Sequence, residues 1–382
     1  MNRRQRLMGI MVSGPNFRRR ELSRYLRYAS TGMKLFSFTP DDIDWERGCI
    51  LGLHRTKRGW TRQRFPFPQA VYNRCYELRQ ETIERLEGVI GKNRCFNHIN
   101  HLDKYRIYEH LSRWLADCIP ETVRYTESEA VEQLLQHRLI FFKPCYGNLG
   151  KGVYRAELTV SGEVRIGDNH LRPKIVASDV AQFLSHMREL IGKTPYIVQR
   201  GVETLRLSGR LFDIRVLAQK NKRGAWSVTS AISRVAYKGC FNTSIFEKMC
   251  LSKDALRYLY PTGKADALFE RICDVSMRAA EIIELDSGLH LGELSVDLAV
   301  DEEGLPWIIE VNGKPQKSLY NGFRHYRTAY LRPLEYANYL SRQGALPRQA
   351  ARIPRPIGIP QLIEDYRLRQ KEARLRGYPP VK

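Results

Sequence analysis

The stretch Gly292–Pro315, GELSVDLAVDEEGLPWIIEVNGKP, is the most informative part of this sequence. Apolar residues alternate with polar or small ones over 295–300, which predicts a strand with one buried face. Three acidic residues and a glycine at 301–304 predict a turn, and the mostly apolar run 307–312 predicts a returning strand. The stretch therefore predicts an antiparallel β-hairpin.

Three oxygen-bearing side chains of this hairpin are expected to point to one place. The large apolar residues of the returning strand are predicted to share a face: Trp307, Ile309 and Val311. Glu310 and Asn312 would share the other face, with Asp297 directly opposite Glu310 or one diagonal away. Two carboxylates and an amide are hard donors that suit Mg²⁺ and not zinc. Because Mg²⁺ commonly completes its shell with phosphates, the hairpin raises the question of a nucleotide site.

A simpler interpretation of the hairpin is that its acidic residues are solvated surface groups. Glu310 and Asn312, however, stand in an otherwise apolar run, where an unpaired carboxylate would be costly. We therefore expect a nearby group that compensates the charge of Glu310.

The charge balance of the chain indicates anionic partners. Its 382 residues carry 63 Lys+Arg against 41 Asp+Glu, a formal net charge of +22, and 43% are hydrophobic, enough for two or three packed domains. The basic residues are spread along the chain, and a run of like charges is more often a solvated face than a binding site. We expect nucleotides or acidic polymers as partners and no specific nucleic-acid recognition. Any DNA binding would be weak and lost with salt.

The cysteine pattern indicates a reducing compartment, and the apolar segments give no sign of a signal peptide or a membrane span. Eight cysteines are scattered without a Cys-x-x-Cys pair, which argues against a zinc ribbon or a small disulfide scaffold. The apolar run Leu7–Val12 is too short for a signal peptide, and no stretch reaches the length of a membrane span. We expect a cytoplasmic protein.

The order of strand and helix patterns predicts a mixed α/β (α+β) chain in four parts. The expected boundaries are residues 1–100, 101–204, 205–340 and 341–382. Apolar spacing predicts helices over 75–89 and 104–118. The last part is rich in Pro, Arg and Gln and is predicted to be a basic arm with a helix over 364–376.

A glycine-rich segment, FKPCYGNLGKGV over Phe142–Val153, is a candidate for phosphate binding. Its glycines are Gly147, Gly150 and Gly152. Glycines let backbone N–H groups approach phosphate oxygens, and Lys151 adds a cation. The segment joins two strands, so it is neither a P-loop nor a Rossmann fingerprint, and it could be an ordinary turn. Lys143 weighs against that, because an ammonium in an apolar strand needs an anionic partner.

Further polar residues follow in strands downstream. The strand Tyr196–Glu203 breaks at Gly201, an edge that can hydrogen-bond an adenine. Asp213 and Arg215 face one way on a strand; they could form a structural ion pair, or Arg215 could clamp a transferring phosphoryl group. Two more polar residues follow in order: Arg234 and Asn242.

In this order the motifs resemble the ATP-grasp superfamily over about 104–315. The series is a strand lysine before a Gly-rich loop, a hinge strand, a D-x-R strand, an Arg…Asn pair, an aspartate and E-x-N. The ordered set carries the resemblance, since no single motif is sufficient. Four segments also resemble the YheC/YheD branch, which is associated with endospore coats: FSFTPDDIDW (Phe36–Trp45), the W…FPFPQAVYNR run (Trp60–Arg74), FNHINHLDKY (Phe96–Tyr105) and FDIRVLAQK (Phe212–Lys220).

The resemblance implies an ATP-grasp fold, in which two α/β subdomains hold ATP between them. Residues 1–100 would form a smaller pre-ATP-grasp domain, 101–204 the lid subdomain with the Gly-rich loop, and 205–340 the subdomain with the metal site. ATP would be contacted by Lys104, Lys143, Gly147, Gly150, Lys151, Gly152, Gln199, Arg200, Asp213 and Asn242. The phosphoryl group in transfer would be stabilised by Arg215 and Arg234. One or two Mg²⁺ ions, or Mn²⁺ in their place, would be held by Asp297, Glu310 and Asn312.

The implied chemistry is ligation. ATP phosphorylates a carboxylate, and an amine, a thiol or another nucleophile attacks the acyl phosphate; at least one substrate would be anionic. One departure is NTSIFEKM over Asn242–Met249, where many relatives have glycines. It leaves open a second interpretation, a spore-associated structural or binding protein on an ATP-grasp scaffold with little or no turnover. In both interpretations the basic arm over 341–382 would contact the spore coat or an acidic polymer.

Overall fold

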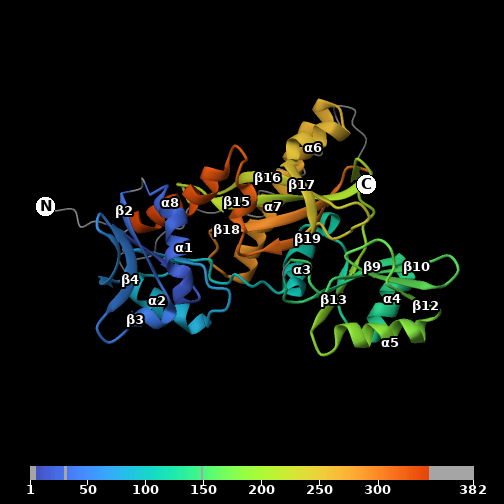
Figure 1. The fold of residues 1–382 in the computed structure, drawn as a ribbon, viewed down its shortest axis with the longest axis horizontal. Helices are drawn as coiled ribbons and strands as arrows, with labels where there is room; N and C mark the ends of the chain where they lie inside the picture. The colour runs from blue at the N-terminus through green and yellow to red at the C-terminus, as the bar shows by residue number, and fades with distance from the viewer. Residues whose placement is uncertain (1–5, 30–31, 148, 344–382) are drawn as a thin grey trace. The chain divides into compact units, whose positions relative to one another are not determined.

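The computed structural model describes residues 6–29, 32–147 and 149–343. Their strands form three sheets that follow one another in the sequence, and the central sheet lies between the other two (Figure 1). Helices pack on these sheets, so the expected mixed α/β class is confirmed. The helix expected over 364–376 lies outside the described residues. No helix among the described residues is long and apolar enough to cross a membrane.

The N-terminal sheet has a parallel centre with a hydrophobic core on each face. Its elements are β1 (Arg6–Met11), α1 (Pro15–Leu26), β2 (Met33–Phe38), β3 (Ile43–Asp44), β4 (Cys49–Thr56), β5 (Gly59–Pro66), β6 (Ala70–Asn73), α2 (Gln80–Ile90) and β7 (Cys95–Phe96). The strand order is β3-β4-β2-β1-β6-β7, with β5 beside β4. Met8 and Ile10 of β1 pack with α1, whereas Leu7 and Met11 pack with α2, as a strand buried on both faces requires.

The second sheet is antiparallel and has helices on one face. It contains β8 (Thr122–Arg124), α4 (Glu127–His137), β9 (Leu139–Pro144), β10 (Tyr154–Leu158), β11 (Val164–Asp168), β12 (Ile175–Ala177), α5 (Val180–Ile191) and β13 (Tyr196–Arg200), in the strand order β12-β11-β10-β9-β13-β8. Figure 1 shows α4 and α5 on the same side. Ile140 and Phe142 pack beneath them, so the alternate residues Leu139, Phe141 and Lys143 face the opposite side.

The central sheet is also antiparallel and has the order β17-β16-β15-β18-β19, with β14 beside β15. Its elements are α3 (Lys104–Ser112), β14 (Arg206–Leu207), β15 (Arg210–Lys220), β16 (Trp226–Ala236), β17 (Phe246–Leu251), α6 (Ser252–Leu259), α7 (Thr262–Ser287), β18 (Glu293–Val300) and β19 (Pro306–Asn312). Ile214 and Val216 pack with α3, α6 and α7 in one core. Because side chains alternate, Asp213, Arg215 and Asp297 are on the other face.

The predicted hairpin is formed by β18 and β19. Asp297 lies directly opposite Glu310 in the register, as expected. The turn closes with a hydrogen bond from the Gly304 N–H to the Asp301 carbonyl at 3.1 Å, and Gly304 has φ +82°. The positive φ explains the glycine at the end of the acidic turn.

One face of the returning strand differs from the prediction. A β-bulge shifts the register between the Asp297 and Leu298 positions of β18. As a result Ile308 joins the core together with Val311, while Ile309 lines a cavity. The expected common face of Trp307, Ile309 and Val311 is therefore wrong, because one extra residue reverses the alternation.

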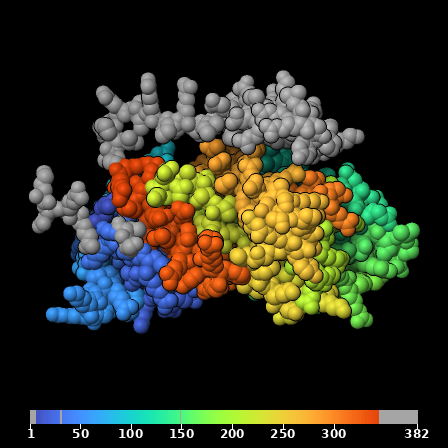
Figure 2. All heavy atoms as spheres, turned by 90° about the horizontal axis from the view of Figure 1, so that it is seen from above, coloured from blue at the N-terminus to red at the C-terminus, as the bar shows by residue number. Residues whose placement is uncertain are grey.

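The last helix, α8 (Tyr326–Arg342), packs on the N-terminal sheet, although it follows the central sheet in the sequence. Leu334 and Tyr336 share a core with Met8 and Phe96, and the rings of Phe96 and Tyr336 meet edge to face at 5.2 Å. Figure 2 shows the red segment that contains α8 against the blue N-terminal region. The proposed domain boundaries remain a prediction, but this helix ties the first expected part to the third.

Two helix boundaries also differ from the sequence-based expectation. The helix expected over 75–89 begins only at Gln80, because the Cys75 N–H is bound by the side chain of Asn73 in a turn. The helix expected over 104–118 ends at Ser112, and a separate 3-10 turn covers Ala116–Cys118. The sequence patterns did not reveal β5, α6 or α8.

Candidate functional site

Two cavities open beside the polar face of the central sheet. The first, about 900 Å³, lies between the β8–β13 sheet and the central sheet. The second, about 920 Å³, lies between α1 and the loop after β6 on one side and the central sheet on the other. Arg234, Ser244 and Glu310 line both cavities, so the two spaces meet at these residues.

Most residues expected to contact ATP or metal line the first cavity: Lys104, Lys143, Gly147, Gly150, Lys151, Gln199, Arg200, Asp213, Arg234, Asn242, Asp297 and Glu310. Arg215 and Asn312 line the second cavity. Gly152 lines neither; it has φ +71°, and a side chain there would meet the Tyr196 hydroxyl. The structure thus gathers the predicted set around one junction, and the individual roles remain predictions.

Asp213 and Arg215 form ion pairs, but not with each other. Arg215 lies directly opposite Asp297 of β18 and donates to its Oδ1 and Oδ2 at 2.6 and 2.5 Å. Arg234 of β16 lies directly opposite Asp213 and binds both of its oxygens. Arg234 also donates to Asp297 Oδ2 at 3.0 Å. The strand pairing therefore links two carboxylates and two guanidinium groups in one cluster.

This cluster keeps Asp297 ionised and limits its role as a metal ligand. Burial raises the pKa of the carboxyl, but the charges of Arg215 and Arg234 outweigh burial and hold the pKa below its usual value. Oδ2 accepts from both guanidinium groups and Oδ1 from one. Each carboxylate oxygen can accept two contacts, so only Oδ1 of Asp297 can accept one more. A metal ion here would therefore depend chiefly on Glu310 and Asn312.

The remaining donors fit a Mg²⁺ ion. The carboxylate of Glu310 meets the ammonium of Lys104 at 3.3 Å, which is the compensating group that the apolar setting of Glu310 predicted. The Nδ2 atom of Asn312 is buried and has no hydrogen-bond partner among the described residues. Because Nδ2 is an N–H donor, an anionic ligand such as a phosphate oxygen would satisfy it, which leaves Oδ1 of Asn312 for a cation. Glu310, Asn312 and Oδ1 of Asp297 could hold a hard cation at the junction.

Lys143 is buried at the wall of the first cavity, and no carboxylate of the described residues lies within ion-pair distance of it. Its ammonium donates to Oε1 of Gln199 at 2.6 Å and to the carbonyl of Ile309 at 3.4 Å. Burial lowers its pKa to about 8, although the charge of Glu310 acts in the opposite direction. Gln199 is in turn fixed by a bond to the Thr122 hydroxyl at 3.0 Å. This ammonium is available to an anion.

The Gly-rich loop rests on the central subdomain through Asn242. The Asn242 amide donates to the carbonyl of Gly150 at 3.4 Å and to Oδ1 of Asn169 at 2.7 Å. Gly150 has φ +67°, and a Cβ atom there would collide with Asn242. The carbonyl of Gly147 accepts from Lys104 at 3.2 Å. Glycine at position 150 therefore permits the loop to cover the cavity in this position.

The structure adds residues that the sequence reasoning missed. The Thr243 hydroxyl donates to Asp213 at 2.7 Å, and the rings of Phe141 and Phe241 meet at 5.6 Å on the cavity wall. Thr243 could have been found, because its hydroxyl follows Asn242 directly in the departing NTSIFEKM segment. The aromatic pair could not, since it joins two sheets whose packing no local pattern reveals.

Comparison with known proteins identifies the family. The model described as "YheC/D like ATP-grasp" matches residues 92–340. The chain belongs to this ATP-grasp family. Endospore coat-associated protein YheD of Bacillus subtilis is 25% identical over 332 residues, which cover 82% of this chain and 72% of YheD. Endospore coat-associated protein YheC of the same organism is 22% identical over 352 residues, which cover 84% of this chain and 92% of YheC.

Solved structures confirm the ATP-grasp fold of this family member. The VanG D-Ala:D-Ser ligase from Enterococcus faecalis superposes with a TM-score of 0.52 at 12% identity, over 88% of this chain and 100% of that one. The D-alanyl-alanine synthetase A from Vibrio cholerae superposes with a TM-score of 0.51 at 14% identity, over 88% and 99%. At such identities the likeness establishes the fold alone.

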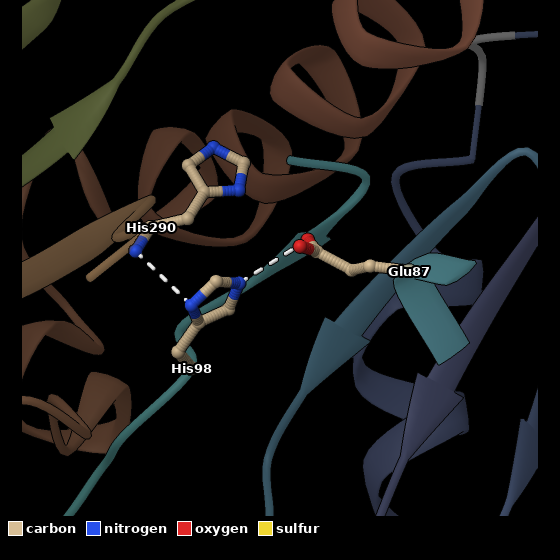
Figure 3. A group of neighbouring side chains, drawn as sticks. All are labelled: Glu87, His98 and His290. Atoms are coloured by element: carbon tan, nitrogen blue, oxygen red, sulfur yellow. Dashed lines mark hydrogen bonds and ion pairs between the residues drawn. The ribbon is translucent and has the colours of Figure 1, made fainter. Parts of the chain in front are cut away.

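A second cluster of polar side chains in this ATP-grasp chain has the composition of a metal site but is fully hydrogen-bonded. Figure 3 shows His98 between Glu87 and His290. His98 Nε2 contacts Glu87 at 3.2 Å, and its Nδ1 accepts from the His290 backbone N–H at 3.3 Å. The ring of His290 contacts the Cys95 carbonyl at 2.8 Å and the Tyr336 hydroxyl at 2.5 Å. We interpret the group as a hydrogen-bonded contact that connects the N-terminal and central sheets.

A third cluster surrounds Glu293, four residues before Asp297 on β18. The carboxylate binds Lys317 at 2.7 Å and Arg74 at 3.0 Å, and it accepts from Gln219 at 2.8 Å and from the Tyr72 hydroxyl. Glu293 has no exposed surface. Burial raises its pKa, but the charges of Lys317 and Arg74 outweigh burial and hold it below the usual value. The cluster connects the N-terminal and central parts of the ATP-grasp chain.

Proposed function

We propose that the protein is an ATP- and Mg²⁺-dependent ligase that activates a carboxylate as an acyl phosphate for attack by an amine or a thiol. The observation that carries the proposal is the meeting of two cavities at Arg234 and Glu310. One cavity has the cations and glycines suited to a nucleotide, and the other offers space for a second substrate beside its phosphates. Membership of the ATP-grasp family, whose fold is shared by ligases, supports the same reaction class.

In this mechanism the protein positions reactants and neutralises charge. Lys104, Lys143 and Lys151 would bind the phosphates, and the Gly147–Gly152 loop would exclude water from the acyl phosphate. The carboxylate oxygen of the substrate attacks the γ-phosphorus while the bond to ADP breaks, and the nucleophile then displaces phosphate. Arg234 and Arg215 would stabilise the developing charge.

A Mg²⁺ ion at this site, when bound, would orient the phosphates and neutralise their charge. Glu310 and Asn312, with the free position of Asp297 Oδ1, would hold it, and Mn²⁺ would suit the same oxygen donors. The expected adenine contact lies near the end of β13, where Val202 and Glu203 continue along the wall beyond Gln199 and Arg200.

Hydroxylamine trapping tests the proposed reaction, because hydroxylamine converts an acyl phosphate to a hydroxamate. The protein with Mg-ATP and hydroxylamine is given pools of small carboxylates and cell-wall fragments, and hydroxamate and ADP are measured. We expect both products to form together, and only when a carboxylate is present. ATP binding without ADP formation in any pool would favour the alternative of a binding protein with little or no turnover.

The alternative function has its own supporting observations. The relatives in Bacillus subtilis are named for their association with the endospore coat, and the NTSIFEKM segment departs from the usual pattern. We propose a coat association for this protein as well, with the basic arm over 341–382 as the contact to an acidic polymer. Deletion of the arm should release the protein from isolated coat fractions; retention would contradict that role.

A further inference from the structure

The second cavity is lined by several cationic side chains. It is bounded by the start of α1, by the residues after β6 and by the residues after β19. Most of its cations are already neutralised within the protein. Glu293 binds Arg74 at 3.0 Å and Lys317 at 2.7 Å, and Glu21 binds Arg24 at 2.7 Å.

Two cations of this cavity, Lys314 and Arg20, differ from the rest. Neither has a carboxylate within ion-pair distance among the described residues. Instead the Lys314 ammonium lies 3.7 Å from the ring centre of Tyr76, and the Arg20 guanidinium lies 5.0 Å from that of Phe17. These rings line the same cavity and are 47% and 42% exposed. Arg74 and Arg20 repel the charge of Lys314 and Glu21 attracts it, but no carboxylate of the described residues forms an ion pair with Lys314 or Arg20.

The simplest alternative is that these cations are solvated surface groups. Arg20 is exposed and alone would be an ordinary surface arginine. Lys314 is partly buried, is held over an aromatic face and follows the last residue of β19 by two positions. The acids on the same wall do not neutralise it, because Glu21 is bound to Arg24 and Glu77 is exposed without an ion-pair partner among the described residues. A cation fixed in this way fits an anionic ligand better than water.

We propose that the carboxylate substrate carries a second anionic group, which Lys314 and Arg20 bind while the reacting carboxylate lies at the junction beside Arg234 and Glu310. The inference rests on the proposed ligase function. The substrate class is an organic dianion, a dicarboxylic acid or an acidic amino acid or peptide. Its carbon chain would pack on the rings of Phe17 and Tyr76. The second anionic group takes no part in the phosphoryl transfer and remains unchanged.

Pairs of compounds that differ by one negative charge test the inference. Hydroxamate formation with Mg-ATP is compared for L-glutamate against L-glutamine, D-glutamate against D-glutamine, and succinate against succinamate. We expect the dianion of at least one pair to react about tenfold or more faster at limiting concentration, as a charge-assisted contact to a partly buried cation predicts. Equal rates within all pairs, or no reaction with any dianion, would overturn the inference.

Matched variants test whether Lys314 and Arg20 cause the preference for a dianion over a monoanion. Lys314→Ala should reduce the ratio between dianion and monoanion toward one, Arg20→Ala should reduce it less, and Lys314→Arg should restore part of it. Lys264→Ala is the control, because its ammonium also lies over a ring, that of Tyr260 at 4.3 Å, but lines neither cavity. A Lys314→Ala protein that keeps the full ratio would overturn the inference. Failure of the intact protein to bind Mg-ATP would instead contradict the proposed function itself.

Discussion

Glu293 and Asp297 are two carboxylates on one face of β18, each held by two cations, yet their surroundings differ. Glu293 is completely enclosed, and Lys317 and Arg74 connect it to the N-terminal part of the protein. Asp297 lines the first cavity, directly opposite Glu310 in the sheet, and is bound by Arg234, which lines both cavities. The same ion-pair chemistry therefore connects two parts of the protein where the carboxylate is enclosed, and can form a ligand site where a cavity reaches it.

The closed cluster should matter most for stability. Glu293→Gln leaves two buried cations with a neutral partner, so we expect a loss of about 3–5 kcal/mol in the free energy of unfolding. Urea unfolding monitored by circular dichroism measures it. The control is Glu303→Gln in the exposed hairpin turn, which should leave unfolding unchanged. Equal, small losses in the free energy of unfolding for both variants would show that Glu293 does not stabilise the contact between the N-terminal and central parts.

Two buried lysines sharpen the comparison, because only one has a carboxylate partner. Lys220 pairs with Glu284 at 2.5 Å, whereas Lys143 contacts an amide and a carbonyl. Lys220→Met should lower the free energy of unfolding by about 3 kcal/mol, because it leaves the Glu284 carboxylate without its cation. Lys143→Met should change stability by no more than about 1 kcal/mol, because the lost Gln199 bond offsets the removed charge. Calorimetric titration should show that Lys143→Met loses ATP affinity; unchanged affinity would remove Lys143 from the site.

The pKa of Lys143 predicts proton uptake on nucleotide binding. Burial lowers this pKa to about 8, so about half of the ammonium groups are deprotonated at pH 8. Phosphate oxygens favour the charged form and raise the pKa, so protons are taken up at pH 8 and hardly at all at pH 6.5. Titrations in buffers of different ionisation enthalpy measure the uptake. Lys314 and Lys317 also have pKa values near 8, but they line the other cavity. Proton uptake measured with nucleotide and no second substrate should therefore come from Lys143. Proton release at pH 8 would contradict the contact.

The smallest expected effect concerns the Gly-rich loop. Gly150→Ala places a methyl group against Asn242, so the loop must move and nucleotide affinity should fall by a few fold. Gly162→Ala is matched to it, because Gly162 also has a positive φ, +89°, but a methyl group there meets open space. Both changes strain the backbone by about 1 kcal/mol. Equal affinities in the two variants would show that the loop does not close as this structure has it.

Local pattern was sufficient for much of the site. The alternation over 295–300 predicted which face of β18 carries Asp297, and the apolar setting of Glu310 predicted a compensating group, which is Lys104. Those inferences hold because they depend on neighbours in the sequence. The common face of Trp307, Ile309 and Val311 was wrong, because a bulge adds one residue and has no signature in the alternation itself.

The parts that escaped prediction depend on contacts between distant segments. The partners of Asp213 and Arg215 follow from strand register, which pairs each with the residue directly opposite on β16 or β18. The packing of α8 on the N-terminal sheet, and the second cavity with Lys314 and Arg20, require the tertiary arrangement. The family resemblance supplied the order of the motifs but not these neighbours.

The most direct test of the account is the affinity for ATP with and without Mg²⁺, measured by calorimetric titration for the intact protein and for Glu310→Gln. We expect Mg²⁺-dependent binding that weakens about tenfold or more in the variant, with unfolding nearly unchanged because Glu310 is only partly buried. Equal affinity in the two proteins, or binding that is indifferent to Mg²⁺, would contradict the claim that the hairpin of β18 and β19 forms the metal and nucleotide site.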